Sequence, residues 1–201
     1  MKNNILYEVH NGLYINLTNR CPCACVFCLR NTKDRVGRSD SLWLDKEPTI
    51  EEIKAEFALR DVSKYEEIVF CGFGEPTERL DAIKEIAAFI KEKYGKPIRI
   101  NTNGLGDLVN GRPIAAELAG LIDVVSISLN TPDEARYMEE VRPRFGEGAY
   151  AALLSFAKDC VKYVPKVVLT TVATTLTKEE EARCAEIASE MGAYYRIRPF
   201  E

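Results

Sequence analysis

The chain has 201 residues, and its 27 Lys and Arg against 31 Asp and Glu give a net charge of -4. This length suggests one domain and is too short for a full eight-stranded barrel, which takes about 250 residues. The charge balance supplies no global basic field for nucleic acid, and no stretch has the ~18 consecutive apolar residues of a membrane span. We therefore expect one domain over residues 1–201, with no membrane or nucleic-acid partner.

Strand-like and helix-like runs alternate along nearly the whole chain. In chain order, the β-rich runs are 5–9, 13–18, 68–70, 98–100, 124–129, 167–172 and 195–198. Between the later runs, helices are predicted at about 49–60, 80–90, 114–121, 149–163 and 177–192. The pairs Thr49/Glu52 and Thr177/Glu180 have the spacing of capping boxes and mark the starts of two helices. Asn11-Gly12 is a turn signal that predicts a hairpin between the first two runs.

This alternation predicts the fold class. Six strands from residue 13 onward recur at intervals of about 30 residues with helices between them, which favours right-handed βαβ units and a parallel sheet. Two closures fit the pattern, an open doubly wound sheet or a partial (β/α)6 barrel. Periodicity alone does not choose between them.

The cysteines are unevenly distributed. Four of the seven fall within eight residues: Cys21, Cys23, Cys25 and Cys28. The other three stand alone and are expected to be core thiols: Cys71, Cys160 and Cys184. The chain begins without the apolar core of a secretory signal, so the expected compartment is the reducing cytoplasm. Clustered cysteines there indicate a metal site or catalysis more often than disulfides.

Cys21, Cys25 and Cys28 form a Cys-x3-Cys-x2-Cys motif at the end of the first parallel strand. Three thiolates on one loop can hold a [4Fe–4S] cluster and leave one iron open to a small molecule. The alternative is structural zinc, which usually takes four ligands. The only histidine is His10, and no second cysteine pair exists. Cys23 is interpreted as a neighbour of the metal ligands.

Polar residues and glycines follow the next strands where each strand ends. These segments are 71–77, 101–104 and 126–130. Because ligand sites of parallel α/β proteins lie at the carboxyl ends of the strands, these segments are expected to share one site with the cysteine loop. Glycine there lets a ligand approach the backbone, and a carboxylate can accept a hydrogen bond from an ammonium group.

With these features together, the chain resembles the radical S-adenosylmethionine (SAM) superfamily over about residues 13–198. The loop carries the three cysteines of that family and an aromatic residue, Phe27, just before the last of them. The resemblance implies a partial (β/α)6 barrel of parallel strands, preceded here by a short N-terminal hairpin strand. It also implies that Cys21, Cys25 and Cys28 hold a [4Fe–4S] cluster.

The same resemblance implies where SAM binds. Gly74-Glu75-Pro76 is similar to the family's Gly-Gly-Glu-Pro stretch, which contacts the SAM amino group, although Phe73 stands in place of its first glycine. Positions on later strands usually face the ribose and the carboxylate. The implied cofactor-binding residues are Phe27, Gly72, Gly74, Glu75, Pro76, Thr102, Asn103, Ser128, Asn130 and Arg198.

The implied activity is reductive cleavage of SAM to a 5′-deoxyadenosyl radical that abstracts hydrogen from a substrate the sequence does not identify. A reducing electron donor of the flavodoxin or ferredoxin type is the expected partner. Residues 13–23 resemble radical SAM proteins associated with TatD-type hydrolases, which implies a pairing with such a hydrolase. Action on a polypeptide, as in glycyl-radical activases, is one interpretation. The alternative from another class is a noncatalytic zinc or iron–sulfur protein that acts as sensor or scaffold.

Overall fold

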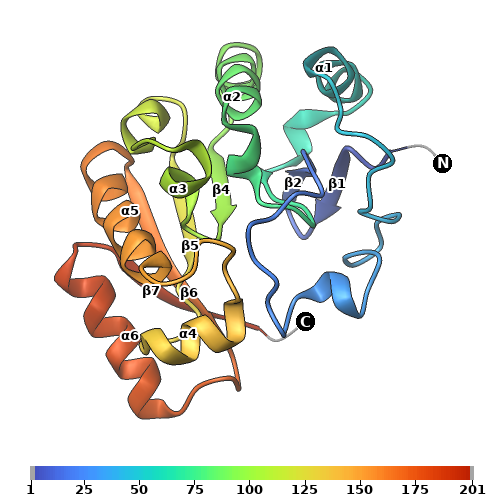
Figure 1. Cartoon of the computed structure of the whole chain (residues 1–201). Coiled ribbons are helices and arrows are strands. Elements are labelled where there is room, and N and C mark those ends of the chain that lie inside the picture. Colours follow the sequence, from blue (N-terminus) through green and yellow to red (C-terminus); the bar gives the residue numbers. More distant parts are fainter. Residues whose placement is uncertain (1–2, 200–201) are drawn as a thin grey trace.

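The computed structural model describes residues 3–199 and contains one seven-stranded sheet in the order β1 to β7 (Figure 1). Strand β1 (Leu6–Val9) pairs antiparallel with β2 (Gly12–Ile15), as the hairpin signal predicts. All later neighbours pair parallel: β3 (Glu67–Phe70), β4 (Ile98–Thr102), β5 (Val124–Ser128), β6 (Lys166–Val172) and β7 (Tyr194–Arg198). Within the described residues β1 and β7 are the two edges, so the sheet does not close.

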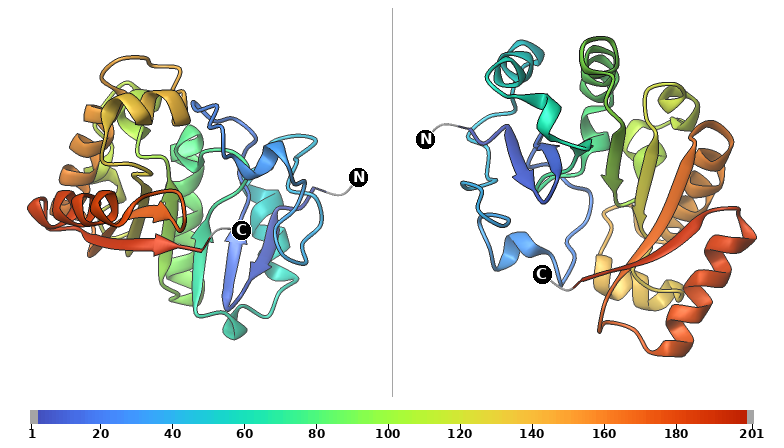
Figure 2. Two further views of the ribbon diagram at one scale, coloured as in Figure 1. Left: turned by 90° about the horizontal axis from the view of Figure 1, so that it is seen from below. Right: turned by 180° about the vertical axis from the view of Figure 1, so that it is seen from behind.

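Helices lie along the outer side of the curved sheet (Figure 2). They are α1 (Ile50–Ala58), α2 (Leu80–Tyr94), α3 (Gly106–Asn110), α4 (Glu134–Val141), α5 (Ala149–Tyr163) and α6 (Lys178–Glu190). Both predicted capping boxes form: Thr49 with Glu52 starts α1, and Thr177 with Glu180 starts α6. The predicted α/β fold with an open, partial barrel is therefore confirmed. None of the helices in residues 3–199 is long and apolar enough to cross a membrane.

The helix predicted over 114–121 is wrong. That segment contains only a 3₁₀ turn, Ala115–Leu118, while the helix of this unit, α3, lies earlier in the chain. Gly111 and Gly120 adopt left-handed conformations, with φ of 65° and 73°. A left-handed residue ends a helix, and Gly111 ends α3 while Gly120 directly follows the C-cap residue of the 3₁₀ turn, Ala119.

Helix α4 was not predicted. Its N-cap is Asp133, whose side chain accepts a hydrogen bond from the backbone nitrogen of Arg136 at 2.7 Å. Only Tyr137 and Val141 of this eight-residue helix are buried, and most of its other residues are charged, so the segment does not stand out as apolar in the sequence.

Side chains alternate between the two faces of each strand. On the outer face, apolar residues such as Ile68, Ile100 and Ile127 pack under the helices and are at most 1% exposed. The inner face differs, because backbone pairing brings polar and charged residues such as Arg99 and Lys166 into register there. The carboxyl ends of the strands and this polar inner face are where the structure offers binding chemistry.

Candidate functional site

The cysteine loop follows β2 and is fixed against the carboxyl end of α4. The backbone nitrogen of Val26 donates to the carbonyl of Glu140 at 2.8 Å, and that of Arg144 donates to the carbonyl of Pro22 at 2.8 Å. Cys23 forms an antiparallel bridge with Pro143. Helix α4, although absent from the sequence prediction, is therefore the element that holds the loop in place.

The four thiols of this loop lie close together. Cys21, Cys25 and Cys28 are half-buried, whereas Cys23 is only 4% exposed. A hydrogen bond from the Cys23 thiol lowers the pKa of Cys21 and of Cys25, and the same bonds raise the pKa of Cys23. Burial raises the pKa of Cys28. The loop thus favours the thiolate, which is the form that binds metals, at two of the three predicted ligands.

The donor set suits an iron–sulfur cluster, since three soft thiolates from one loop can each bind a different iron. Among residues 3–199, no three Cys, His, Asp or Glu side chains are grouped so as to hold a single metal ion. The buried Cys23 forms hydrogen bonds with the thiols of Cys21 and Cys25. The assignment of Cys21, Cys25 and Cys28 as ligands stays a prediction.

Glu75 joins the turns that follow β3 and β4. Its carboxylate is 3% exposed and accepts hydrogen bonds from the backbone nitrogen and hydroxyl of Thr77, at 3.1 and 2.8 Å. It also accepts from the Thr102 hydroxyl and the Asn103 backbone nitrogen, both at 2.7 Å. Burial raises the pKa of Glu75, and these bonds partly offset that effect. The turns predicted to bind SAM are thereby locked to each other.

Gly72 and Gly74 make close contacts within the chain. A Cβ added to Gly74 would lie 2.2 Å from the carbonyl oxygen of Thr18 and 2.6 Å from that of Arg20. A Cβ on Gly72 would lie 2.1 Å from Oδ1 of Asn16. The turn after β3 therefore packs directly on the backbone at the start of the cysteine loop, which only glycine permits.

The Phe73 side chain explains how this chain tolerates a residue other than glycine in the motif. Phe73 is 8% exposed and packs with Tyr7 and Leu42. Its ring meets that of Trp43 edge to face, with centroids 5.1 Å apart. Phe73 thus belongs to a small apolar cluster with Trp43 as its exposed edge.

Two asparagines carry polar atoms toward this region. Nδ2 of Asn103 lies 3.5 Å from the sulfur of Cys23, which brings the turn after β4 to the cysteine loop. Asn130 is 7% exposed and has φ of 66°, and its buried Oδ1 has no hydrogen-bond partner. A buried acceptor without a donor indicates a ligand or water that completes it. The residues present therefore fit a bound polar cofactor.

The remaining predicted residues are more dispersed. Pro76 is buried at the start of a short 3₁₀ turn, Pro76–Arg79, and Phe27 is 37% exposed. Ser128 ends β5 and Arg198 ends β7. The structure brings the cysteine loop, the Glu75 turn and Asn103 into direct contact, and it places Ser128 and Arg198 at the same end of the sheet.

Sequence reasoning missed two residues of this region. Arg30 donates to the backbone carbonyls of Asn19, Cys23 and Phe73, at 3.3, 3.1 and 3.4 Å, and so joins the cysteine loop to the Gly72–Gly74 turn. Tyr137 is fully buried, its hydroxyl has no hydrogen-bond partner, and burial raises its pKa. Arg30 follows the cysteine motif outside any recognisable pattern, and Tyr137 lies on the helix that was not predicted.

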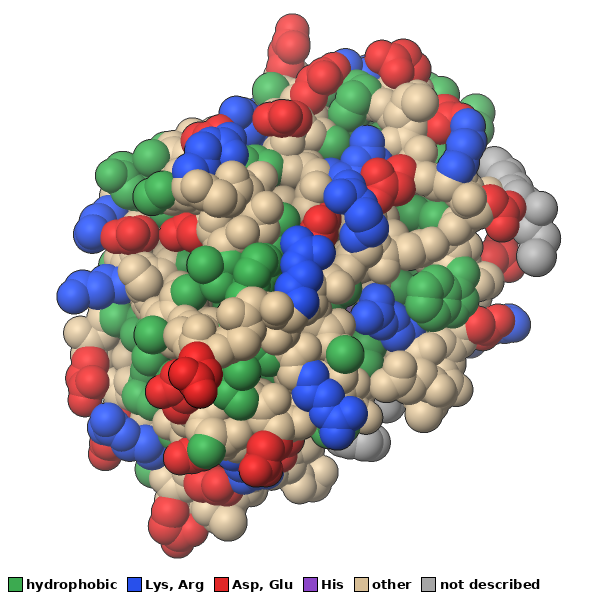
Figure 3. Space-filling model, viewed as in Figure 1, with side chains coloured by type: hydrophobic (Ala, Val, Ile, Leu, Met, Phe, Trp, Pro, Cys, Tyr) green, Lys and Arg blue, Asp and Glu red, His purple; other side chains and the backbone are tan. Residues whose placement is uncertain are grey.

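Basic side chains line the middle of the face that carries the cysteine loop (Figure 3). Beside the cysteines, Arg20 contacts Glu47 at 2.7 Å, and both Arg20 and Arg144 contact Glu78 at 3.3 Å. These pairs join the loop to the segment after β3. They therefore support the loop's conformation.

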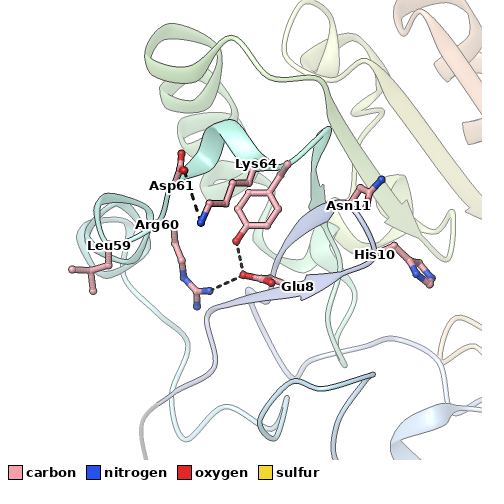
Figure 4. Close-up of a pocket in the computed structure, with 8 residues that line it drawn as sticks. Glu8, His10, Asn11, Leu59, Arg60, Asp61 and Lys64 are labelled. Atoms are coloured by element: carbon pink, nitrogen blue, oxygen red, sulfur yellow. Dashed lines mark hydrogen bonds and ion pairs between the residues drawn. The ribbon is translucent and has the colours of Figure 1, made fainter.

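A separate cavity of about 420 Å³ lies by the β1–β2 hairpin, on the side opposite the strands' carboxyl ends (Figure 4). Its charges neutralise each other. Arg60 and the Tyr65 hydroxyl donate to Glu8, and Lys64 lies 3.9 Å from Asp61. This cavity thus offers little unbalanced charge to a ligand.

Residues 15–189 match the Radical SAM superfamily. No curated protein sequence matches the chain. The chain is similar to Streptococcus suis SuiB bound to precursor peptide SuiA, with a TM-score of 0.69, 15% identity, and coverage of 95% of this chain and 39% of SuiB. It is also similar to methylornithine synthase (PylB), with a TM-score of 0.61, 17% identity, and coverage of 94% and 53%.

A radical SAM methyltransferase from Sphaerobacter thermophilus gives a TM-score of 0.60 and 17% identity, over 96% of this chain and 57% of that protein. The chain thus spans only 39% to 57% of the length of these three proteins. At these identities the likeness shows the fold, which is that of the partial barrel described above. The family match over residues 15–189 establishes membership: the chain belongs to the radical SAM superfamily.

Proposed function

We propose that this chain is an enzyme that binds a [4Fe–4S] cluster and SAM and cleaves SAM reductively to abstract hydrogen from a substrate. One observation carries the proposal. The three-cysteine loop is packed directly against the Glu75 turn and Asn103, at the carboxyl ends of β3 and β4, in a chain that belongs to this superfamily.

The chain's own residues hold and orient the cofactors in this proposal. Cys21, Cys25 and Cys28 bind the cluster. Glu75 fixes the turns after β3 and β4 relative to each other, and the Oδ1 of Asn130 accepts a hydrogen bond from SAM. When bound, the cofactors supply one-electron cleavage of a carbon–sulfur bond, which yields a 5′-deoxyadenosyl radical. The protein binds, orients and excludes water.

The context of the reaction is proposed from the sequence and the fold together. A flavodoxin or ferredoxin supplies the electron, and the compartment is the reducing cytoplasm, where clustered thiols stay reduced. The resemblance of residues 13–23 supports a pairing with a TatD-type hydrolase. Action on a polypeptide is favoured by the open edge between β1 and β7, which leaves the inner face accessible from the side.

Anaerobic reconstitution with iron and sulfide, followed by electron paramagnetic resonance, tests the proposal. We expect a reduced cluster whose signal changes when SAM is added, because SAM binds the iron that lacks a cysteine. A protein that takes up only zinc, or a cluster whose spectrum SAM leaves unchanged, would instead identify a noncatalytic sensor or scaffold.

A further inference from the structure

The inner face of the sheet carries a second group of polar residues, deeper than the strand ends. Backbone pairing puts Ser126, Val168 and Tyr194 in one row across β5, β6 and β7, and Ser128, Thr170 and Arg196 in the next. Arg198 lies two residues further toward the carboxyl end of β7. Arg196 is therefore on the same face as the end of β5 that is predicted to bind SAM, but one step below Arg198.

A cavity of about 360 Å³ opens on this inner face. Its charged lining residues are Glu67 on β3, Arg99 on β4, Lys166 on β6 and Arg196 on β7. Val168 and Tyr194 add apolar surface to its wall. A volume of this size suits a small organic molecule or one side chain of a larger substrate.

The charges in this cavity do not balance. Glu67 is bound by Arg99 through two contacts, at 2.6 and 3.1 Å, and Arg99 also donates to Oδ1 of Asn101 at 2.6 Å. The one acid of the lining is thus neutralised by Arg99, which is 11% exposed in its side chain. Lys166 and Arg196 have no acidic partner among residues 3–199, so they give the cavity an excess of two positive charges.

The Tyr194 ring lies beside the Lys166 ammonium group. The Nζ of Lys166 lies 5.1 Å from the centroid of the Tyr194 ring, and that ring is 61% exposed although it is large and aromatic. A cation beside an exposed aromatic ring, with a second cation on the adjoining strand, can bind an oxyanion joined to an apolar group. The cavity by the β1–β2 hairpin lacks this imbalance, because its charges pair with each other.

We propose that this cavity binds an oxyanion group, a carboxylate or a phosphate, of the substrate, through Lys166 and Arg196, with its carbon skeleton against Tyr194 and Val168. This assignment rests on the proposed function, because the anion is taken to be part of the substrate from which hydrogen is abstracted. The cavity lies on the same inner face as the proposed SAM site but nearer the amino ends of the strands, since Glu67, Lys166 and Tyr194 each begin a strand. A substrate anchored there by its anion must therefore extend along the inner face to the carboxyl ends.

Titration calorimetry on the anaerobically reconstituted protein at low salt tests the site with three probes of one shape: phenyl phosphate, benzoate and the uncharged benzamide. We expect at least one anion to bind saturably and benzamide to bind at least about tenfold more weakly, since a charged hydrogen bond contributes that much. Whichever anion binds more tightly identifies the group as phosphate or carboxylate.

Lys166→Gln and Arg196→Gln should each weaken binding of the preferred anion about tenfold or more. Arg183→Gln removes the same charge from the outer surface of α6, where Arg183 pairs with Glu186, and should leave binding unchanged. Both tested side chains belong to exposed strand positions, and circular dichroism confirms that each variant is folded. Equal binding of benzamide, no saturable binding of either anion, or an equal effect of Arg183→Gln would overturn the proposal.

The same preparation separates this inference from the proposed function. Formation of 5′-deoxyadenosine by the wild-type protein, without any probe, tests the function alone. Cleavage of SAM without anion binding would refute the anion site and leave the enzyme assignment standing. Anion binding without SAM cleavage would refute the enzyme assignment and leave an anion site of another purpose.

Discussion

The carboxylate of Glu75 accepts a hydrogen bond from the backbone nitrogen of Asn103 at 2.7 Å, and this contact joins the turns after two neighbouring strands. The Asn103 side chain in turn reaches the sulfur of Cys23 at 3.5 Å. A short chain of contacts thus runs from the β3 turn through the β4 turn to the cysteine loop. The geometry of the candidate site depends on this chain of contacts.

Replacing Glu75 tests how much the junction contributes to the fold. In Glu75→Gln, an amide NH₂ takes the place of one oxygen that accepts from Thr102 and Thr77 or from Asn103. The buried amide NH₂ of the glutamine then faces hydrogen-bond donors of these residues and leaves them without an acceptor. We therefore expect the free energy of unfolding to fall by about 1–3 kcal/mol. Urea denaturation measures it. Glu179→Gln, an exposed glutamate in the first turn of α6, is the matched control and should change stability little. Equal stability of the two variants would show that the junction contributes nothing.

Glu75 also predicts a pH dependence. Burial raises its pKa above the ordinary value of 4.5, so the folded chain binds this proton more tightly than the unfolded chain does. The contribution of protonated Glu75 to the free energy of unfolding is fully present below the pKa that Glu75 has in the unfolded chain. It is lost as pH rises through the pKa of Glu75 in the folded chain. We expect the stability of the wild type relative to Glu75→Gln to fall as pH rises from about 4.5 toward neutrality. Urea titrations at several pH values measure the difference, and a constant or rising difference contradicts the prediction.

Gly74 should resist substitution for a steric reason. The Cβ of Gly74→Ala would lie 2.2 and 2.6 Å from two backbone oxygens, which cannot move without shifting the cysteine loop. We expect a loss of about 2–3 kcal/mol, together with weaker iron uptake. In Gly146→Ala nothing lies within 4 Å, and only the φ of 68° opposes the new side chain, so its loss should be about 1 kcal/mol with normal iron uptake. Thermal unfolding and iron analysis compare the two, and similar results for both would argue against the packing of this turn on the loop.

Replacing single cysteines should change how much iron the protein binds. Cys25→Ala removes one predicted cluster ligand from a half-buried position, and Cys160→Ala removes a thiol that is fully buried in the core. We expect Cys25→Ala to lose most bound iron and the visible absorption of the cluster while it stays folded. Cys160→Ala should keep both and lose only a little stability, because the cavity is small. Full iron loading of Cys25→Ala would remove that residue from the ligand set.

The sequence revealed those parts of the fold that depend on local patterns. The apolar runs of the strands and the capping pairs Thr49/Glu52 and Thr177/Glu180 act within a few residues, so they are visible without a structure. The turn at Gly111 and the polar helix that contains Tyr137 were not predicted, because one depends on a backbone conformation and the other on few buried residues.

The candidate site divides in the same way. The cysteine spacing and the Glu75 segment are local motifs, and a resemblance to a family connects them. The contacts of Arg30 with three carbonyls and the pairing of Glu75 with Asn103 join segments that are far apart in the chain, so they require the folded structure. The same is true of Lys166 and Arg196, which line one cavity only because β6 and β7 pair side by side.

The central claim is that this chain cleaves SAM at a cluster held by its own cysteine loop. The most direct test is to incubate the anaerobically reconstituted protein with SAM and dithionite and to measure 5′-deoxyadenosine by mass spectrometry, with Cys25→Ala treated in parallel. The account predicts that 5′-deoxyadenosine forms with the wild type and does not form with Cys25→Ala. A wild-type protein that carries a full cluster and forms no 5′-deoxyadenosine, or a Cys25→Ala variant that forms it at the wild-type rate, would contradict the account.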